Sequence, residues 1–353
     1  MTGFGIYLHV PFCRRRCDYC DFATWTDRTH LAERYLRACR RQAEQAAPEL
    51  PPVTSVFVGG GTPSLVDPAS LLAVLEPLAI VDGAEVTIEC NPDDVTPELL
   101  RAYRDHGVTR ISMGVQSMVP HVLAALGRTH DPASVHRAVE AAHALDLDLN
   151  LDLIYGVAGE SEADWERTLD EAIGLDPDHL SAYALTVEPG TPLAADPARH
   201  PDDDDQADKY RIADERLGAA GFAWYEISNW AKPGHECRHN LLYWSQGEYL
   251  GIGCAAHSHR DGRRFWNLRT PDRYVDAIEQ GRSPEAADER LDADGRRLEG
   301  LQLRLRTIDG VPADSFADDD LELLDGLVEI DAERARLTRS GRLLANEVAV
   351  HLR

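Results

Sequence analysis

The strongest constraint on the fold is an alternation of short runs rich in β-branched residues with longer segments of helical periodicity. Two of the longer segments, residues 31–46 and 132–145, carry apolar side chains at intervals of three and four residues, which is typical of amphipathic helices. Strands that are regularly followed by helices predict βαβ units, and six such units form a partial or full barrel around a parallel sheet. The predicted strands are residues 5–10, 54–60, 85–90, 109–116, 149–156 and 179–186.

The alternation weakens after about residue 195, and this change predicts the domain limits. We expect an α/β core over residues 1–195, an extension of the barrel over residues 196–284 and a C-terminal domain over residues 285–353. The last segment begins as a helix and ends as a hairpin followed by a helix, the pattern of a winged-helix-like domain. Because acidic residues outnumber basic ones there, we expect it to pack against the barrel instead of binding DNA.

Composition restricts the partners and the compartment. The 353 residues carry a net charge of -25, which opposes contact with phosphate backbones, so we expect no nucleic-acid partner. No apolar run of about 18 residues predicts a membrane span, and the N-terminus lacks the basic start and cleavage site of a signal peptide. The seven cysteines do not form the dense framework of a secreted scaffold. We therefore expect a cytoplasmic protein whose clustered thiols bind metal.

Three cysteines, Cys13, Cys17 and Cys20, form a C-x3-C-x2-C motif directly after the first predicted strand. Structural zinc normally takes four protein ligands in two separated pairs, and this motif supplies three clustered ones. A [4Fe-4S] cluster held by three cysteines leaves one iron open to another ligand. The spacing favours such a cluster over an incomplete zinc site or three incidental thiols.

The stretch YLHVPFCRRRCDYC, residues 7–20, resembles the signature of the radical S-adenosylmethionine (SAM) superfamily. The resemblance implies a partial (β/α)6 TIM-like barrel, a [4Fe-4S] cluster on Cys13, Cys17 and Cys20, and SAM bound at the open iron. In that superfamily, electron transfer into the SAM sulfonium generates a 5′-deoxyadenosyl radical. The resemblance thus implies a scaffold that can cleave SAM reductively.

A glycine-rich stretch, GGGTP at residues 59–63, ends the second predicted strand, where glycines let another group approach the backbone closely. Alone it predicts a tight turn, and by resemblance it is the motif whose backbone contacts the SAM amino group. The resemblance implies a SAM pocket lined by Tyr7, Tyr19, Gly60, Gly61, Thr62, Glu89, Gln116, Arg128, Asp152 and Ala184. The alternative for each polar residue is a structural role, and Arg128 and Asp152 could form only an ion pair at the barrel rim.

Stretches 181–193, 225–244, 251–258 and 337–348 extend the resemblance to the coproporphyrinogen III dehydrogenase-like branch. In the dehydrogenases of this branch the motif is C-x3-C-x2-C-x-C, whereas this chain has Phe22 in place of the last cysteine. In this respect the chain resembles the heme-chaperone (HemW-type) group, whose motif ends in phenylalanine. HNLLYW, residues 239–244, matches the H-N-x-x-Y-W motif of that group and implies that His239 contributes to a heme site. This branch implies a radical SAM-type heme chaperone that delivers heme to an acceptor such as a respiratory-chain component.

Several alternatives remain open at this stage. The alternative function is that of an oxygen-independent coproporphyrinogen III dehydrogenase, which converts two propionates to vinyls by radical oxidative decarboxylation. Phe22 and the short N-terminal segment argue against this alternative. His239 could instead be a hydrogen-bonded loop residue, and Cys237 is a conceivable thiolate ligand. His257 and His259 in their glycine-rich turn could line a pocket, and we expect a structural role for both. A homodimer and peripheral contact with a membrane during heme delivery are compatible with the sequence.

Overall fold

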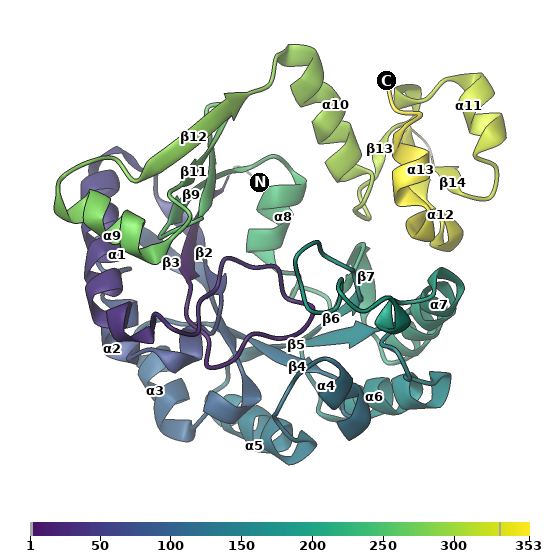
Figure 1. Ribbon diagram of the computed structural model, residues 1–353. Coiled ribbons are helices and arrows are strands. Elements are labelled where there is room, and N and C mark those ends of the chain that lie inside the picture. The colour runs from purple at the N-terminus through teal and green to yellow at the C-terminus, as the bar shows by residue number, and fades with distance from the viewer. Residues whose placement is uncertain (1–2, 332) are drawn as a thin grey trace.

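The computed structural model describes residues 3–331 and 333–353, and a mixed sheet of twelve strands forms its centre (Figure 1). Six strands run parallel to one another and lie side by side in chain order, which confirms the predicted βα units, and a seventh parallel strand from later in the chain joins them beside the first. The six are β1 (Phe4–Val10), β2 (Val53–Gly60), β3 (Ile80–Cys90), β4 (Arg110–Gln116), β5 (Asp148–Tyr155) and β6 (His179–Ala184). Parallel neighbours bring all their carboxyl ends to one edge, where the following loops meet.

Helices cover the outer face of these strands (Figure 1). They are α1 (Ala32–Ala46), α2 (Pro68–Leu72), α3 (Pro97–Asp105), α4 (Pro120–Ala125), α5 (Pro132–His143), α6 (Glu162–Gly174) and α7 (Asp203–Ala219). Asp67, Thr96 and Asp131 cap α2, α3 and α5 by accepting the backbone N–H three residues on, and proline occupies the first turn of each. A capping box between Ser161 and Asp164 starts α6. These local interactions therefore define the residues at which the helices begin.

The segment after β6 extends the same sheet at both edges. The added strands are β7 (Ala223–Glu226), β8 (Asn229–Ala231), β9 (Glu248–Ile252), β10 (His257–Arg260), β11 (Arg263–Asn267) and β12 (Glu285–Arg290), with helices α8 (Arg238–Trp244) and α9 (Pro271–Glu279) between them. β9 pairs in parallel with β1 and is followed outward by β10, β11 and β12, whereas β8 and β7 continue beyond β6. Because β12 and β7 end the strand order, the barrel is partial, as predicted.

The C-terminal segment has a small core of its own. It contains β13 (Val311–Pro312), β14 (Val328–Asp331) and β15 (Arg334–Leu337), together with α10 (Ala293–Arg304), α11 (Asp318–Leu323), α12 (Arg339–Leu343) and α13 (Ala345–Ala349). This mostly helical unit with a three-stranded antiparallel sheet agrees with the expected class. The strand β12 pairs with β11 of the large sheet, and the boundary at residue 285 stays a prediction.

Charged side chains join the C-terminal unit to the barrel. Arg339 and Arg342 form ion pairs with Asp214 of α7 at 2.6 and 3.1 Å, and the Arg342 guanidinium lies 3.6 Å over the ring of Trp224 in β7. A backbone hydrogen bond from Ile308 to Tyr225 continues this contact. These contacts pack the C-terminal unit against the barrel, as expected. Among the residues that the structure describes, no helix combines the length and the apolar character needed to span a bilayer.

Candidate functional site

A cavity of about 400 Å³ opens at the carboxyl ends of the parallel strands. It brings together the loop after β1, the ends of β2 to β6 and the loops that follow them. The predicted residues in its lining are Cys13, Cys17, Cys20, Tyr19, Gly60, Gly61, Thr62, Glu89, Gln116, Arg128, Asp152 and Ala184. Of the residues predicted to bind the cluster or SAM, only Tyr7 lies outside this lining.

The cysteine loop, residues 11–25, is closed on itself by backbone hydrogen bonds. The Cys13 N–H donates to the carbonyl of Trp25 at 3.2 Å, and the Trp25 N–H donates to the carbonyl of Pro11 at 2.7 Å. Closing the loop at its base limits the positions that the three cysteines between these ends can take. All three line the same cavity.

The surroundings of the three thiols suit their role as ligands to a metal. The Thr62 hydroxyl donates to Cys13 Sγ at 3.6 Å, and Arg128 Nη1 donates to Cys17 Sγ at 3.5 Å. Burial raises the pKa of Cys13 and raises that of Cys20 to about 11, so a positive charge is needed to keep these thiols ionised. Iron supplies such a charge and prefers thiolate ligands in clusters. The three thiols therefore fit the predicted cluster.

Two glycines let the end of β2 approach β1 and the cysteine loop closely. Gly60 has φ +111°, and a Cβ there would clash with the ring of His9 in β1. A Cβ on Gly61 would lie 2.7 Å from the carbonyl oxygen of Phe12, while the Gly61 N–H donates to the carbonyl of Val10 at 2.8 Å. The sequence predicted that these glycines let a ligand approach the backbone. In the structure the protein's own backbone also approaches them closely, and this contact positions the cysteine loop.

Two carboxylates form an acidic wall of the cavity. Glu89 Oε2 accepts the Gly60 N–H at 3.0 Å, and burial together with the charge of Asp152 raises the pKa of Glu89 to about 7. Asp152 accepts hydrogen bonds from Ser112 and Asn150, both at 2.9 Å, and burial raises its pKa as well. Carboxylates in this environment favour a ligand that brings a positive charge or hydroxyl donors.

Arg128 and Gln116 complete the polar lining. Arg128 Nη2 donates to Asn91 Oδ1 at 2.8 Å and to the carbonyl of Gly114 at 2.7 Å. Within residues 3–331 and 333–353 no ion pair joins Arg128 to Asp152, so the alternative of a rim ion pair is wrong. Gln116 adopts φ +64°, a strained backbone conformation for a residue with a side chain. Strain of this kind is concentrated at ligand-binding sites.

A second cavity, of about 440 Å³, adjoins the first and contains Tyr7. Asp21, Phe22 and Gly60 line both cavities. The remaining lining includes the aromatic side chains of Tyr243 and Tyr249, the imidazole of His257 and the guanidinium of Arg269. Sequence reasoning missed this cavity, because it depends on the pairing of β9 with β1, which lie far apart in the chain.

His239 lies in neither cavity. It is fully buried on α8, where Nδ1 shares a hydrogen bond with Ser55 Oγ at 3.0 Å and Nε2 shares one with Tyr243 Oη at 2.8 Å. Burial lowers its pKa to about 3. Cys237 is also buried, its thiol donates to Glu85 Oε1 at 3.4 Å, and burial raises its pKa to about 12. Both side chains are therefore engaged in the interior of the protein.

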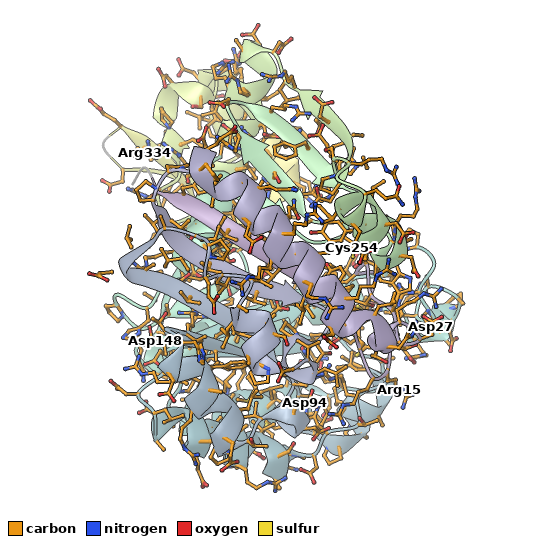
Figure 2. The ribbon with its side chains drawn as sticks, turned by 90° about the vertical axis from the view of Figure 1, so that its left-hand side faces the viewer. Arg15, Asp27, Asp94, Asp148, Cys254 and Arg334 are labelled. Carbon is orange, nitrogen blue, oxygen red and sulfur yellow. The ribbon has the colours of Figure 1, made fainter. Side chains whose placement is uncertain are left out.

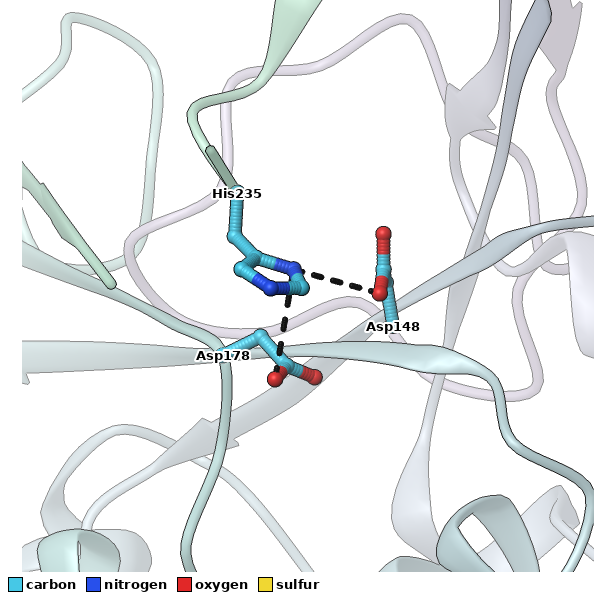
Figure 3. A group of neighbouring side chains, drawn as sticks. All are labelled: Asp148, Asp178 and His235. Carbon is cyan, nitrogen blue, oxygen red and sulfur yellow. Dashed lines mark ion pairs between the residues drawn. The ribbon is translucent and has the colours of Figure 1, made fainter. Parts of the chain in front are cut away.

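A separate cluster of one histidine and two aspartates lies at the amino ends of β5 and β6 (Figure 3). His235 Nδ1 lies 3.2 Å from Asp148 Oδ1 and 3.9 Å from Asp178 Oδ1. Asp178 also accepts the Leu149 N–H at 2.9 Å. Figure 2 shows Asp148 on the side of the molecule opposite to Arg15 of the cysteine loop. These contacts hold the loop before α8 against the sheet, away from both cavities.

The comparisons with known proteins agree with this geometry. A family model described as the radical SAM superfamily matches residues 7–172, which cover the cysteine loop and most of the parallel strands. The barrel and the three-cysteine cavity therefore define a radical SAM protein, a class whose members carry a [4Fe-4S] cluster and SAM.

Relatives that match nearly the whole chain identify the family within this class. The chain is 44% identical to the heme chaperone HemW of Mycobacterium tuberculosis, over 98% of this chain and 93% of that protein. It is 32% identical to HemW of Bacillus subtilis, over 97% of each. The structure of coproporphyrinogen III oxidase (HemN) from Escherichia coli has the same fold, with a TM-score of 0.85 and 24% identity over 99% of this chain and 89% of that one. The chain belongs to the HemW heme-chaperone family.

Proposed function

We propose that this protein binds heme and passes it to an acceptor protein, with a [4Fe-4S] cluster and SAM held beside the heme. The observation that carries the proposal is that a three-cysteine cavity adjoins a second, aromatic cavity along the shared Phe22 and Gly60. Aromatic walls suit a flat, largely apolar macrocycle, and polar groups at the rim suit its propionates. The names of the relatives support the same ligand.

The first cavity supports binding of both family cofactors. Cys13, Cys17 and Cys20 would hold the cluster, and Tyr19, Gly60, Gly61, Thr62, Glu89, Gln116, Arg128, Asp152 and Ala184 would hold SAM. When bound, the cluster can supply an electron to the sulfonium of SAM. The chain itself provides the acidic wall of Glu89 and Asp152 for a cationic ligand, and it orients Arg128 through Asn91 and Gly114.

Phe22 favours the chaperone over coproporphyrinogen III dehydrogenase. The residue is 57% exposed and lies on the wall that the two cavities share. A phenylalanine side chain offers an apolar face against which a macrocycle can pack, and unlike cysteine it has no reactive thiol. This residue stands where the dehydrogenase motif has its fourth cysteine, so the chain keeps the cluster ligands and lacks that thiol.

Anaerobic heme titration tests the proposal. The protein, purified and reconstituted with iron and sulfide, is titrated with hemin and followed by its Soret band, and we expect one heme per chain. Incubation of the loaded protein with apomyoglobin then measures transfer to an acceptor. The same preparation is incubated with dithionite, SAM and coproporphyrinogen III, from which we expect no protoporphyrinogen. Failure to bind heme stoichiometrically would overturn the chaperone proposal, and protoporphyrinogen formation would support the dehydrogenase.

The cellular setting is part of the same proposal. We propose a cytoplasmic protein that delivers heme to an acceptor such as a respiratory-chain component, with peripheral contact at the membrane during delivery. A homodimer is compatible with this role. Sedimentation velocity with and without hemin measures the oligomeric state, and flotation with vesicles of anionic lipid measures membrane contact.

A further inference from the structure

We propose that His257 is the protein ligand to heme iron in the second cavity and that Arg269 pairs with a heme propionate. This inference rests on the proposed function and assigns residues to its heme site. The starting point is His239, whose two ring nitrogens already share hydrogen bonds with Ser55 and Tyr243 in the interior. A histidine that binds iron needs one free ring nitrogen that faces the ligand.

The second cavity offers two histidines, and they differ in availability. His9 is buried, with Nδ1 hydrogen-bonded to Tyr7 Oη at 3.0 Å and Nε2 hydrogen-bonded to the carbonyl oxygen of Ala23 at 2.9 Å. His257 is exposed, and in the part of the chain that the structure describes neither of its ring nitrogens has a hydrogen-bond partner. His257 is therefore the histidine of this cavity that can bind iron without breaking an existing contact.

The fold holds His257 in a defined place. It is the first residue of β10, and its ring stacks on Trp266 of β11 with ring centres 5.4 Å apart and an interplanar angle of 25°. The turn before it contains two residues with positive φ, Gly253 at +99° and Ala255 at +57°. Ala255 itself lines the cavity. A non-glycine residue held in this conformation indicates that the neighbouring structure constrains the turn.

The remaining lining has the chemistry of a heme pocket. Tyr243 and Tyr249 form an edge-to-face pair with ring centres 4.6 Å apart, and Phe22 adds an apolar side chain on the wall shared with the cysteine cavity. The volume of about 440 Å³ falls in the range of roughly 300–1,000 Å³ that small-molecule pockets occupy. An open pocket with these walls suits a ligand that must later leave.

Arg269 supplies the charge that a propionate needs. It is exposed, it lines the cavity, and within residues 3–331 and 333–353 it forms no ion pair. Asp21 is the acidic residue of the same lining and belongs to the cysteine loop. A guanidinium binds a carboxylate through two parallel hydrogen bonds. We therefore expect a propionate at Arg269 and away from Asp21.

The test compares hemin binding by the reconstituted parent, His257→Ala, His239→Gln and the matched control His259→Ala. His259 lies two residues along β10, where its Nδ1 is hydrogen-bonded to the carbonyl of Gly247 and it lines neither cavity. We expect His257→Ala to raise the Kd for hemin about tenfold or more and to shift the Soret band, with added imidazole restoring the parent spectrum. His239→Gln and His259→Ala should keep the parent spectrum.

A second comparison isolates the propionate contact. Arg269→Gln should weaken binding of hemin by about tenfold and leave binding of hemin dimethyl ester unchanged, because the ester carries no carboxylate. Unchanged affinity and Soret band in His257→Ala, or an equal loss in His259→Ala, would overturn the ligand assignment while the chaperone function stands. If the parent itself binds no heme, the proposed function fails, and this inference fails with it. Equal sensitivity of hemin and its ester to Arg269→Gln would overturn the propionate contact.

Discussion

The burial of His239 predicts a specific loss of stability in mild acid. The imidazole is fully buried between Ser55 and Tyr243, and its pKa is lowered to about 3, compared with about 6.5 in an unfolded chain. Below pH 6.5 the unfolded chain therefore binds a proton that the folded protein excludes. Since the unfolded state then binds more protons, the free energy of unfolding falls as the pH drops from 6.5 towards 3.

The magnitude follows from the two pKa values. Each unit of pH within this window costs about 1.4 kcal/mol, so His239 alone lowers the free energy of unfolding by about 2 kcal/mol between pH 7 and pH 5. Urea unfolding of the cluster-free protein, followed by tryptophan fluorescence at both pH values, measures the change. The comparison is between the parent and His239→Gln, because the other buried histidines are present in both and cancel.

We expect the parent to lose about 2 kcal/mol more than His239→Gln between pH 7 and pH 5. The matched control is Tyr243→Phe, which removes a hydrogen-bond partner of His239 and keeps the imidazole. It should be less stable at both pH values and should retain the full pH dependence. The reasoning is refuted if the parent and His239→Gln depend on pH equally, since His239 would then titrate in the folded protein as it does in the unfolded chain.

Other predictions address the cofactor cavity and the barrel. With Glu89 at a pKa of about 7, SAM affinity should fall as the pH drops below 7, by up to about tenfold per unit, and Glu89→Gln should bind SAM more weakly and without this dependence, as calorimetry can measure. Gly61→Ala, which forces the cysteine loop away from β2, should lower the iron and sulfide content after reconstitution, whereas Gly218→Ala, at an open position of α7, should retain both. Lys209→Met leaves the buried Glu160 without its cation, so it should lower the free energy of unfolding by about 3–5 kcal/mol at pH 7, and an unchanged urea midpoint would contradict this.

Much of the cofactor cavity could be predicted because its residues follow strand ends. Cys13 comes after β1, Gly60 ends β2, Glu89 is near the end of β3, Gln116 ends β4 and Asp152 lies in β5. In a parallel sheet all of these ends meet at one edge, so local patterns are enough to place the residues together. The structure shows that they line one cavity.

The second cavity could not be predicted in this way. Tyr7 points into it, beside Tyr249 and His257, because β9 inserts next to β1 in the sheet. Pairing between strands more than two hundred residues apart leaves no periodic signal in the chain. The sequence left both a structural role and a pocket-lining role open for His257, and it could not show that this ring faces a cavity while that of His239 is enclosed.

The sequence by itself determined the βα architecture, the cluster motif and the family, because these depend on hydrophobic period and on the spacing of neighbouring residues. Only the tertiary structure decided which polar side chains face a cavity and which are enclosed in the interior. His239 and His257 are the same residue type only eighteen positions apart, yet one is fully buried with both nitrogens bonded and the other is exposed beside Trp266. The physical reason is that burial and hydrogen bonding arise from strands and helices that meet across the fold, and the ligand chemistry of an imidazole depends on both.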